Sequence, residues 1–344
     1  MKNIIVIFSS FFIPFVACAQ SGLSISQQPQ KKQVDILYDG KLLTAYCYYD
    51  SVAKPVLFPV NTIDGITVTR GYPLAPRPGE RTDHPHHIGI WMNYESVNGI
   101  DFWNNSTAIP ADKKDLYGTI KHDKIVTSGA AGNTAFLTAT AGWFNNKGDQ
   151  YLKEKSTYQF KVEKGVFIID RITTLTALDQ QVIFKDVKDG FFAIRVAREL
   201  EMPSKEPGIF VDAHGNQTRV DATNGKEVTG MYYNSMGTTG DSVWSSKAPW
   251  AMLKGTKEGK PITIAMFDHP NNIGYPTYWH ARGYGLFALN PLGRKVFSNG
   301  KEALNFTLQP HQSAKFIYRI IIASKDLNNN EISKISHAFE KLKY

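Results

Sequence analysis

Cysteine is scarce in this sequence: its 344 residues include two, Cys18 and Cys47. Cys18 falls within the N-terminal stretch that we expect to be removed, so Cys47 is left without an internal partner. A disulfide scaffold is therefore excluded, and the fold must be held by a hydrophobic core, which a chain of this length can build. Cys47 itself lies in a strand-like apolar run, where cysteine behaves as a small hydrophobic residue.

Long apolar runs are equally scarce. The one present, residues 4–16, follows the positive charge of Lys2 and leads into Ala17-Cys18-Ala19, which has the small residues of a leader cleavage site. This pattern predicts a signal peptide over residues 1–19 and an exported protein, periplasmic or secreted. The alternative is a lipoprotein anchored to the outer membrane through Cys18. No later run approaches the roughly 20 residues that cross a bilayer, so no transmembrane segment is expected.

Several catalytic motifs are absent. The sequence has no G-x-S-x-G elbow, no H-E-x-x-H pair and no phosphate-binding glycine loop, which disfavours serine hydrolases, zinc proteases and nucleotide-dependent enzymes. The net charge of +8 and the 12% aromatic content suit an anionic partner. Without a basic helix or an aromatic-basic sheet motif, nucleic acid is disfavoured, and an anionic oligosaccharide is the partner we expect.

Short runs of β-branched and aromatic residues fill most of the chain, separated by glycine and asparagine turns. Asp39-Gly40 is a hairpin signal, and similar turns recur at short intervals. A helical pattern occurs at residues 331–342 alone, whereas residues 20–33 are polar and suggest a loose lead-in. The sequence therefore predicts an all-β fold, a large antiparallel β-sandwich with a short C-terminal helix. We expect residues 20–344 to form one catalytic domain.

The first segment with evident chemistry covers residues 80–105. It holds three histidines within four residues, His84, His86 and His87, beside Glu80, Arg81 and Asp83. A strand beginning at His87 would place Trp91 and Asn93 on the same face as the imidazole, with Ile88 and Ile90 in the core. That face would offer a ring on which a sugar can stack and polar groups around it.

These histidines allow two chemical interpretations. They suit general acid and base catalysis near neutral pH, with His86 and His87 as catalytic residues. They also suit a divalent metal ion, for which His84, His86 and the distant His269 are candidate ligands. Glu80 and Arg81 are predicted to bind substrate.

The second segment, residues 267–291, repeats the Asp-His-Pro triplet as Asp268-His269-Pro270. If its later part is extended, one face carries the side chains that can bind an anion and move protons, which are Tyr278, His280, Arg282 and Tyr284. Arginine clasps a carboxylate through two parallel hydrogen bonds, and a phenol can donate a proton. We predict His280, Tyr278 and Tyr284 as catalytic residues, with Arg282 and Trp279 binding substrate.

A family resemblance rests on these same stretches. Residues 83–91, residues 98–103, and residues 268–270 with 279–288 resemble exported bacterial proteins often labelled "methane oxygenase PmoA". A membrane methane oxygenase needs several transmembrane helices, which this sequence lacks, so the label is misleading. The resemblance implies a role in polysaccharide utilisation and a fold similar to the large sandwiches of sugar mutarotases and polysaccharide lyases. One branch resembles dehydratases that act on ulvan-type oligosaccharides.

On that basis we expect a carbon–oxygen lyase that removes water from the non-reducing-end uronic acid and leaves a 4,5-unsaturated sugar. His86 or His87 would be the base, Arg81 or Arg282 the carboxylate clamp, and Tyr278, Tyr284 or His280 the acid. A metal ion would replace the arginine as electron sink. The alternatives are a glycoside hydrolase with paired carboxylates, a sugar epimerase, and a glycan-binding protein without catalysis.

Overall fold

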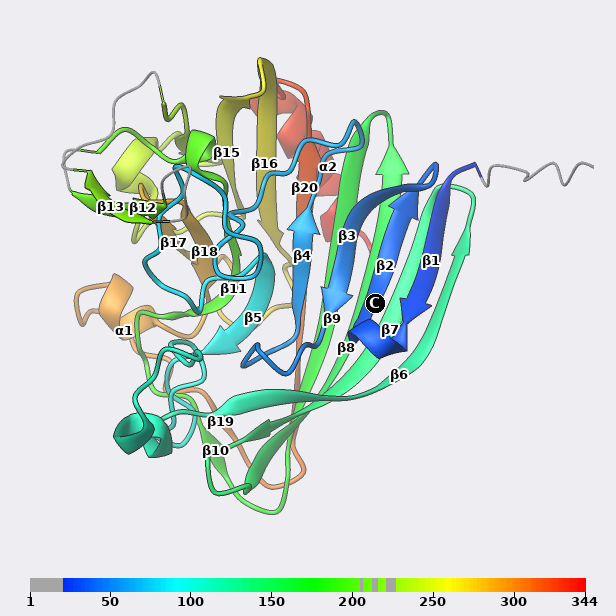
Figure 1. The fold of residues 1–344 in the computed structure, drawn as a ribbon. Helices are drawn as coiled ribbons and strands as arrows, with labels where there is room; N and C mark the ends of the chain where they lie inside the picture. The colour runs from blue at the N-terminus through cyan, green and yellow to red at the C-terminus, as the bar shows by residue number, and fades with distance from the viewer. Residues whose placement is uncertain (1–20, 205–206, 212–215, 221–226) are drawn as a thin grey trace, which may run out of the picture.

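The computed structural model describes residues 21–204, 207–211, 216–220 and 227–344. The expected leader, residues 1–19, lies outside these ranges. Two eight-stranded antiparallel sheets pack against one another and enclose the main hydrophobic core (Figure 1). The predicted antiparallel β-sandwich is confirmed. Within the described ranges, no helix combines the length and the apolar character needed to cross a membrane.

The first sheet has the strand order β1-β2-β3-β4-β5-β11-β18-β17. Its strands are β1 (Leu23–Gln28), β2 (Gln33–Tyr38), β3 (Lys41–Cys47), β4 (Val56–Val60), β5 (Ile90–Tyr94), β11 (Gly190–Arg195), β18 (Leu286–Asn290) and β17 (Tyr278–Arg282). Both histidine-bearing segments contribute a strand to this sheet, β5 and β17.

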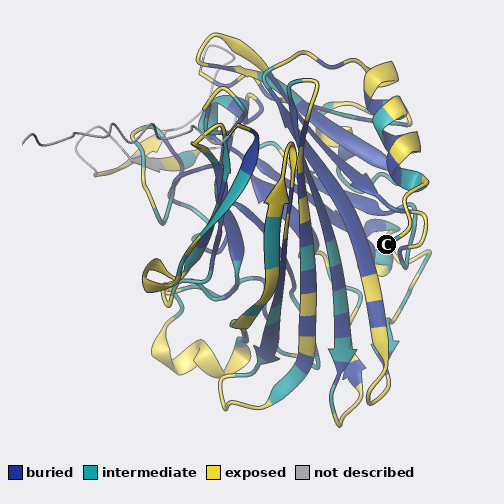
Figure 2. Ribbon diagram, turned by 90° about the vertical axis from the view of Figure 1, so that its right-hand side faces the viewer, coloured by how far each residue is buried: buried dark blue, intermediate teal, exposed yellow. Residues whose placement is uncertain are grey.

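The second sheet has the order β14-β15-β16-β20-β9-β8-β7-β6. Its strands are β14 (Met231–Asn234), β15 (Trp250–Lys257), β16 (Lys260–Asp268), β20 (Ser313–Ala323), β9 (Val166–Ala177), β8 (Gln150–Glu163), β7 (Thr134–Phe144) and β6 (Thr119–Ala131). Buried and exposed residues alternate along the long strands, which is the period expected where one face is packed and the other is open (Figure 2).

The remaining elements are short. Two-stranded sheets pair β10 (Val182–Ile183) with β19 (Thr307–Leu308), and β12 (Gly208–Val211) with β13 (Gln217–Val220). The 3-10 turns span Pro29–Lys31, Ala111–Leu116, Arg198–Leu200 and Gly240–Val243. Two α-helices follow, α1 (Arg294–Phe297) and α2 (Asn329–Glu340).

Helix α2 matches the predicted C-terminal helix and covers the outer face of the second sheet. It begins with a capping box, in which Asn328 and Glu331 satisfy each other's backbone N–H groups. Ile332 and Phe339 are fully buried against a second, smaller core on that face. This layer also covers the ring of His269, which follows β16.

Two predictions about local structure were wrong. The polar lead-in contains strand β1, which pairs with β2 over its whole length, because an edge strand tolerates polar residues on its open side. Strand β5 begins at Ile90 rather than at His87, since Gly89 has a positive φ of 57°. Ile88 therefore packs with Trp91 outside the inter-sheet core.

Candidate active site

Strand β5 of the first histidine-bearing segment and strand β17 of the second carry side chains on the outer face of the first sheet, the face turned away from the second sheet. Strand register places Trp91, Ala193, Ala288 and His280 in one row across β5, β11, β18 and β17. Their strand neighbours point the other way, into the inter-sheet core. The two alanines between the indole and the imidazole have short side chains. The two segments therefore share one face, and the alanines leave space over the centre of the row.

A column of four aromatic rings joins the two segments. The ring of Tyr284 stacks on that of His84 at 5.1 Å, and His84 stacks on His87 at 4.9 Å, each pair parallel within 4°. His87 stacks in turn on Trp91 at 5.2 Å. The column runs from Tyr284 through the partly exposed His84 down to Trp91, which has no solvent contact.

Asp83 ties this column to two buried arginines. Its Oδ1 accepts hydrogen bonds from Arg70 at 2.9 Å and from Arg195 at 2.8 Å. Burial alone would raise the pKa of Asp83, but the guanidinium of Arg195, with His84 and Arg70, holds it well below its ordinary value. Its other oxygen lies 3.3 Å from Nδ1 of His84, within ion-pair distance although outside hydrogen-bond geometry.

His84 is the exposed member of the cluster. Its side chain is 40% exposed, whereas the other four histidines of the two segments are buried. Its backbone has a positive φ of 45°, a strained conformation for a residue that carries a Cβ and precedes proline. Strain of this kind, about 1–3 kcal/mol, persists where the surroundings hold it and is common at functional sites.

The buried histidines are neutral. Burial, reinforced by neighbouring cations, lowers the pKa of His86 and His87 well below the ordinary value and that of His280 to about 3. Nδ1 of His87 lies 3.1 Å from a nitrogen of Arg195, which can only donate, so the proton of His87 sits on Nε2. Among the described residues, Nε2 of His86, Nε2 of His87 and Nδ1 of His280 have no hydrogen-bond partner. These three ring nitrogens are therefore available for hydrogen bonds in the inner part of the site.

Three carboxyl groups and one lysine lie around these imidazoles. Burial raises the pKa of Asp189, Glu95 and Asp101, and Oδ1 of Asp189 lies 3.8 Å from Nδ1 of His280. Lys54 is buried, donates to the carbonyl of His86 at 2.7 Å, and has a pKa lowered by burial to about 7. The inner site therefore contains one lysine that can exchange a proton near neutral pH and three carboxyl groups whose burial favours the protonated form.

A hollow of about 580 Å³ opens beside the ring column. The residues that line it include Arg81, Ser204, Asp241, Trp244, Arg282 and Tyr284. The guanidinium of Arg282 is exposed and lies 6.0 Å from the Trp244 ring and 5.9 Å from the Tyr284 ring. Arg81 contributes a second guanidinium and pairs with the buried Glu201 at 3.0 Å. Two cations and two aromatic rings thus surround a space large enough for a sugar.

Four predicted substrate-binding residues do not reach this space. Trp91 and Trp279 are completely buried, the first beneath His87 and Trp103 and the second between the sheets. Asn93 is buried and donates to the carbonyl of Phe102. Glu80 is buried and accepts from the backbone of Gly71 and from Arg77. Loops and neighbouring rings cover these four residues, so the structure places them away from the hollow.

The predicted catalytic residues separate by position. Tyr284 lines the hollow, whereas His86, His87 and His280 lie behind it with no more than 8% of their surface exposed. Tyr278 does share a face with His280 but packs on Phe297 of α1, and its hydroxyl bonds Glu302 at 3.2 Å. A direct contact between substrate and Tyr278 is therefore not supported by this arrangement.

The proposed metal ligands do not converge. His269 lies on the outer face of the second sheet, with its ring against Phe339 and Tyr344, apart from His84 and His86. In the described part of the chain, no three histidine, cysteine or acidic side chains are arranged to hold an ion. These three candidate ligands therefore do not form one metal site in the described part of the chain.

Sequence reasoning missed the residues that hold the site together. Arg70, Arg195, Lys54 and Trp244 come from outside both histidine-rich segments. Arg195 closes β11, and its place beside Asp83 depends on the pairing of β11 with β5. The one available signal was the presence of arginine at the end of a strongly apolar strand, where a buried charge needs a partner.

Comparison with known proteins adds a family and a set of distant structures. Residues 33–337 match the family described as "Family of unknown function (DUF6807)". No curated protein matches the sequence.

Solved structures with some similarity include the galactosidase domain of an alpha-galactosidase-sucrose kinase, with 12% identity and a TM-score of 0.40 over 88% of this chain and 42% of that one. A galactose 1-epimerase from Lactobacillus acidophilus NCFM has 12% identity and a TM-score of 0.35, over 89% and 98% of the two chains. A putative aldose 1-epimerase from Escherichia coli K12 has 8% identity and a TM-score of 0.34, over 88% and 99%. At this level the likeness says nothing about activity.

Proposed function

Since the chain belongs to the Family of unknown function (DUF6807), its activity has to follow from its site, and we propose that it is a carbohydrate-active carbon–oxygen lyase. The substrate we propose is an anionic oligosaccharide, from whose non-reducing-end uronic acid the enzyme removes water. One observation carries the proposal. A strained, partly exposed histidine is held by an ionised carboxylate beside a hollow lined by two arginines.

The arginines suit the carboxylate of a uronic acid. Arg282 is exposed at the hollow and has no ion-pair partner among the described residues, and Arg81 lies on the same wall. A guanidinium presents parallel N–H groups that match a carboxylate, and its charge stabilises the enolate-like anion that forms when the neighbouring proton leaves. Trp244 and Tyr284 offer ring faces for the sugar.

His84 is placed to act as the base. Asp83, kept ionised by Arg70 and Arg195, faces Nδ1 and favours the tautomer with its proton there, which leaves Nε2 to take the proton beside the carboxylate. Asp83 also stabilises the imidazolium that results. His86 and His87, the bases that the sequence pattern suggested, are buried, so their exposed neighbour His84 takes that role here.

Tyr284 is placed to act as the acid. Burial raises the pKa of Tyr284, partly offset by Arg195, so the phenol holds its proton at neutral pH. As the carbon–oxygen bond breaks, the phenol gives that proton to the departing hydroxyl, which leaves as water. The electron pair of the broken carbon–hydrogen bond forms the new double bond, and the proton on His84 returns to Tyr284 to restore the site.

A glycoside hydrolase is the second candidate, favoured by the carboxyl cluster of the inner site. Asp189, Glu95 and Asp101 have raised pKa values, and the backbone N–H of Asp189 lies 3.2 Å from Oε2 of Glu95. A protonated carboxyl group beside an ionised one is the pairing that glycosidases use. These groups lie deeper than His84, which is why the lyase is preferred.

Product analysis separates the possibilities. The protein is incubated with saturated and unsaturated uronate oligosaccharides, with and without a chelator, and followed by ultraviolet absorbance and mass spectrometry. Loss of one water from the saturated oligomer, with a new enol-ether absorbance, supports the lyase. Gain of water with chain scission selects the hydrolase, and binding without any product contradicts both. Export through the leader expected at residues 1–19 is part of the proposal, because such polymers lie outside the cell.

A further inference from the structure

The outer face of the second sheet carries an ordered set of lysines at the end opposite its apolar, α2-covered part. Strand register sets two rows across β6, β7, β8 and β9, which are Lys121, Gly142, Lys153 and Thr176 in one and Lys124, Thr140, Lys155 and Thr174 in the other. Within each row, two strand spacings put the lysine backbones about 10 Å apart. All four lysines are exposed, and the threonines between and beside them supply hydroxyl groups.

The charge of this face is not neutralised within the chain. No ion pair among the described residues involves any of the four lysines. Asp123 accepts a hydrogen bond from Thr140 at 2.8 Å, and Glu154 turns inward to pair with Arg171 at 2.8 Å. Since Asp123 keeps its own negative charge, the four lysines leave this face with a net positive charge toward solvent.

An aromatic ring lies in the middle of the lysine face. Phe144 occupies the space over Gly142, where a Cβ would come within 2.5 Å of the ring, and Nζ of Lys121 is 5.3 Å from the ring centre. These residues, with Lys153 and Lys155, line a hollow of about 610 Å³. A ring flanked by cations and hydroxyl groups is suited to a sugar that carries negative charge.

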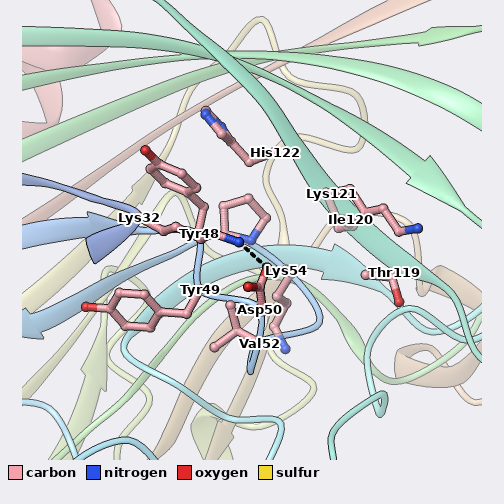
Figure 3. Close-up of a pocket in the computed structure, with 11 residues that line it drawn as sticks. Lys32, Tyr48, Tyr49, Asp50, Val52, Lys54, Thr119, Ile120, Lys121 and His122 are labelled. Carbon is pink, nitrogen blue, oxygen red and sulfur yellow. Dashed lines mark hydrogen bonds and ion pairs between the residues drawn. The ribbon is translucent and has the colours of Figure 1, made fainter. Parts of the chain in front are cut away.

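A second hollow of about 410 Å³ adjoins the first, and Lys121 and His122 line both. Figure 3 shows Tyr48, Tyr49 and His122 around it, with Lys32 paired to Asp50 at its rim. The rings of Tyr48 and His122 lie 4.1 Å apart, and the hydroxyl of Tyr46 holds Nδ1 of His122 at 3.2 Å. The lysine face thus continues into a pocket with aromatic walls.

We propose that the lysine face and the adjoining aromatic hollow form an accessory binding site for an anionic oligosaccharide chain. Regularly spaced cations fit repeated carboxylate or sulfate groups, and the intervening threonines and rings fit the hydroxyl groups and faces of the sugars between them. A polyphosphate would contact the lysines but would leave the threonine hydroxyl groups and the aromatic rings unused, so the oligosaccharide is the ligand we propose. The site is separate from the ring column. The buried Lys54 lies between them: it lines the aromatic hollow and contacts His86 and Trp91 on its other side.

Calorimetric titration with a hexamer of galacturonic acid tests this site, with maltohexaose as the neutral probe. The variant is Lys153→Gln/Lys155→Gln, and the matched control is Lys161→Gln, an exposed lysine of the same strand that is paired to Glu163 at 2.6 Å. We expect the acidic hexamer to bind wild type and control alike, more weakly as ionic strength rises, and to lose about tenfold in affinity in the double variant. Tyr48→Ala should weaken binding further.

The result is independent of turnover, because all these changes lie outside the ring column. Unchanged affinity in the double variant, or equal binding of the neutral hexamer without salt dependence, would overturn the accessory site. Binding of a single-stranded oligonucleotide in preference to the acidic hexamer would also overturn it and assign the face to nucleic acid. If the double variant loses binding while wild type yields no product from any uronate, the accessory site stands and the lyase proposal fails.

Discussion

The chain contains the triplet Asp-His-Pro twice, and its two copies lie in opposite environments. Asp83 is partly exposed and bound by two arginines, whereas Asp268 is fully buried and bound by the amide groups of Asn272 and Thr277. The same three residues therefore hold an ionised carboxylate at Asp83, whereas at Asp268 burial favours the protonated form of the carboxyl group. Surroundings, rather than the motif, decide what the triplet can do.

The histidines differ in the same way. His84 has a strained backbone, faces solvent, and stacks beneath Tyr284 at the edge of a hollow. His269 is 1% exposed and is enclosed by Phe339 and Tyr344 behind α2. The first triplet is thus open to a ligand, and the second is part of a core. Each prediction below compares a residue in or beside the first copy with its counterpart in or beside the second.

The largest difference is expected between His84→Gln and His269→Gln. Loss of a general base costs about 10²- to 10⁴-fold in rate, so His84→Gln should lower kcat/KM for the saturated uronate oligosaccharide by at least about 100-fold. His269→Gln should leave kcat/KM within about twofold and lower the thermal midpoint. Both are measured by steady-state kinetics with circular dichroism as the fold control. Equal loss of activity in both variants would contradict the assignment.

The second difference concerns stability against pH. Burial raises the pKa of Asp268 to about 7, so its contribution is complete below about pH 4 and is lost as the pH rises toward 7, an effect of roughly 4 kcal/mol. The lowered pKa of Asp83 has the opposite sign: its contribution is present at neutral pH and is lost as the pH falls below about 4. Urea unfolding from pH 2 to pH 8 measures both, the first between pH 4 and pH 7 and the second below pH 4.

The matching variants should separate these slopes. Asp268→Asn should flatten the decline between pH 4 and pH 7, whereas Asp83→Asn should keep that decline and cost about 3 kcal/mol at pH 7, because two buried arginines lose their counter-charge. A wild-type unfolding free energy that rises from pH 4 to pH 7 and is flattened by neither variant would show that the two carboxyl groups do not differ as described.

How far the sequence predicted this arrangement depends on the kind of feature. Alternation and turn signals predicted the sandwich and the shared face of His280 and Arg282, because both depend on local periodicity. The burial of Trp91 was missed, since it depends on Trp103 and Lys54, which reach it through loops. The role of Arg195 depends on the pairing of β11 with β5, nearly 100 residues away, and no local pattern encodes that.

The smallest expected difference is between Tyr284→Phe and Tyr344→Phe, the phenols that lie over the two histidines. Tyr284→Phe should lower kcat by about tenfold with little change in KM, because it removes a proton donor and keeps the ring. Tyr344 bonds Asp170 at 2.7 Å beside His269, so Tyr344→Phe should affect stability alone. Kinetics at saturating and limiting substrate distinguish the outcomes, and a change confined to KM in Tyr284→Phe would rule out its role as acid.

The most direct measurement is a crystal structure of His84→Gln with a saturated uronate oligosaccharide bound. We expect the terminal sugar in the hollow beside Tyr284, with its carboxylate against Arg282 and the carbon next to that carboxylate facing position 84. The central claim is that the first triplet takes part in catalysis. It would be contradicted by a terminal sugar bound at the second triplet. It would also be contradicted by a sugar on the lysine face while solvent fills the hollow beside Tyr284.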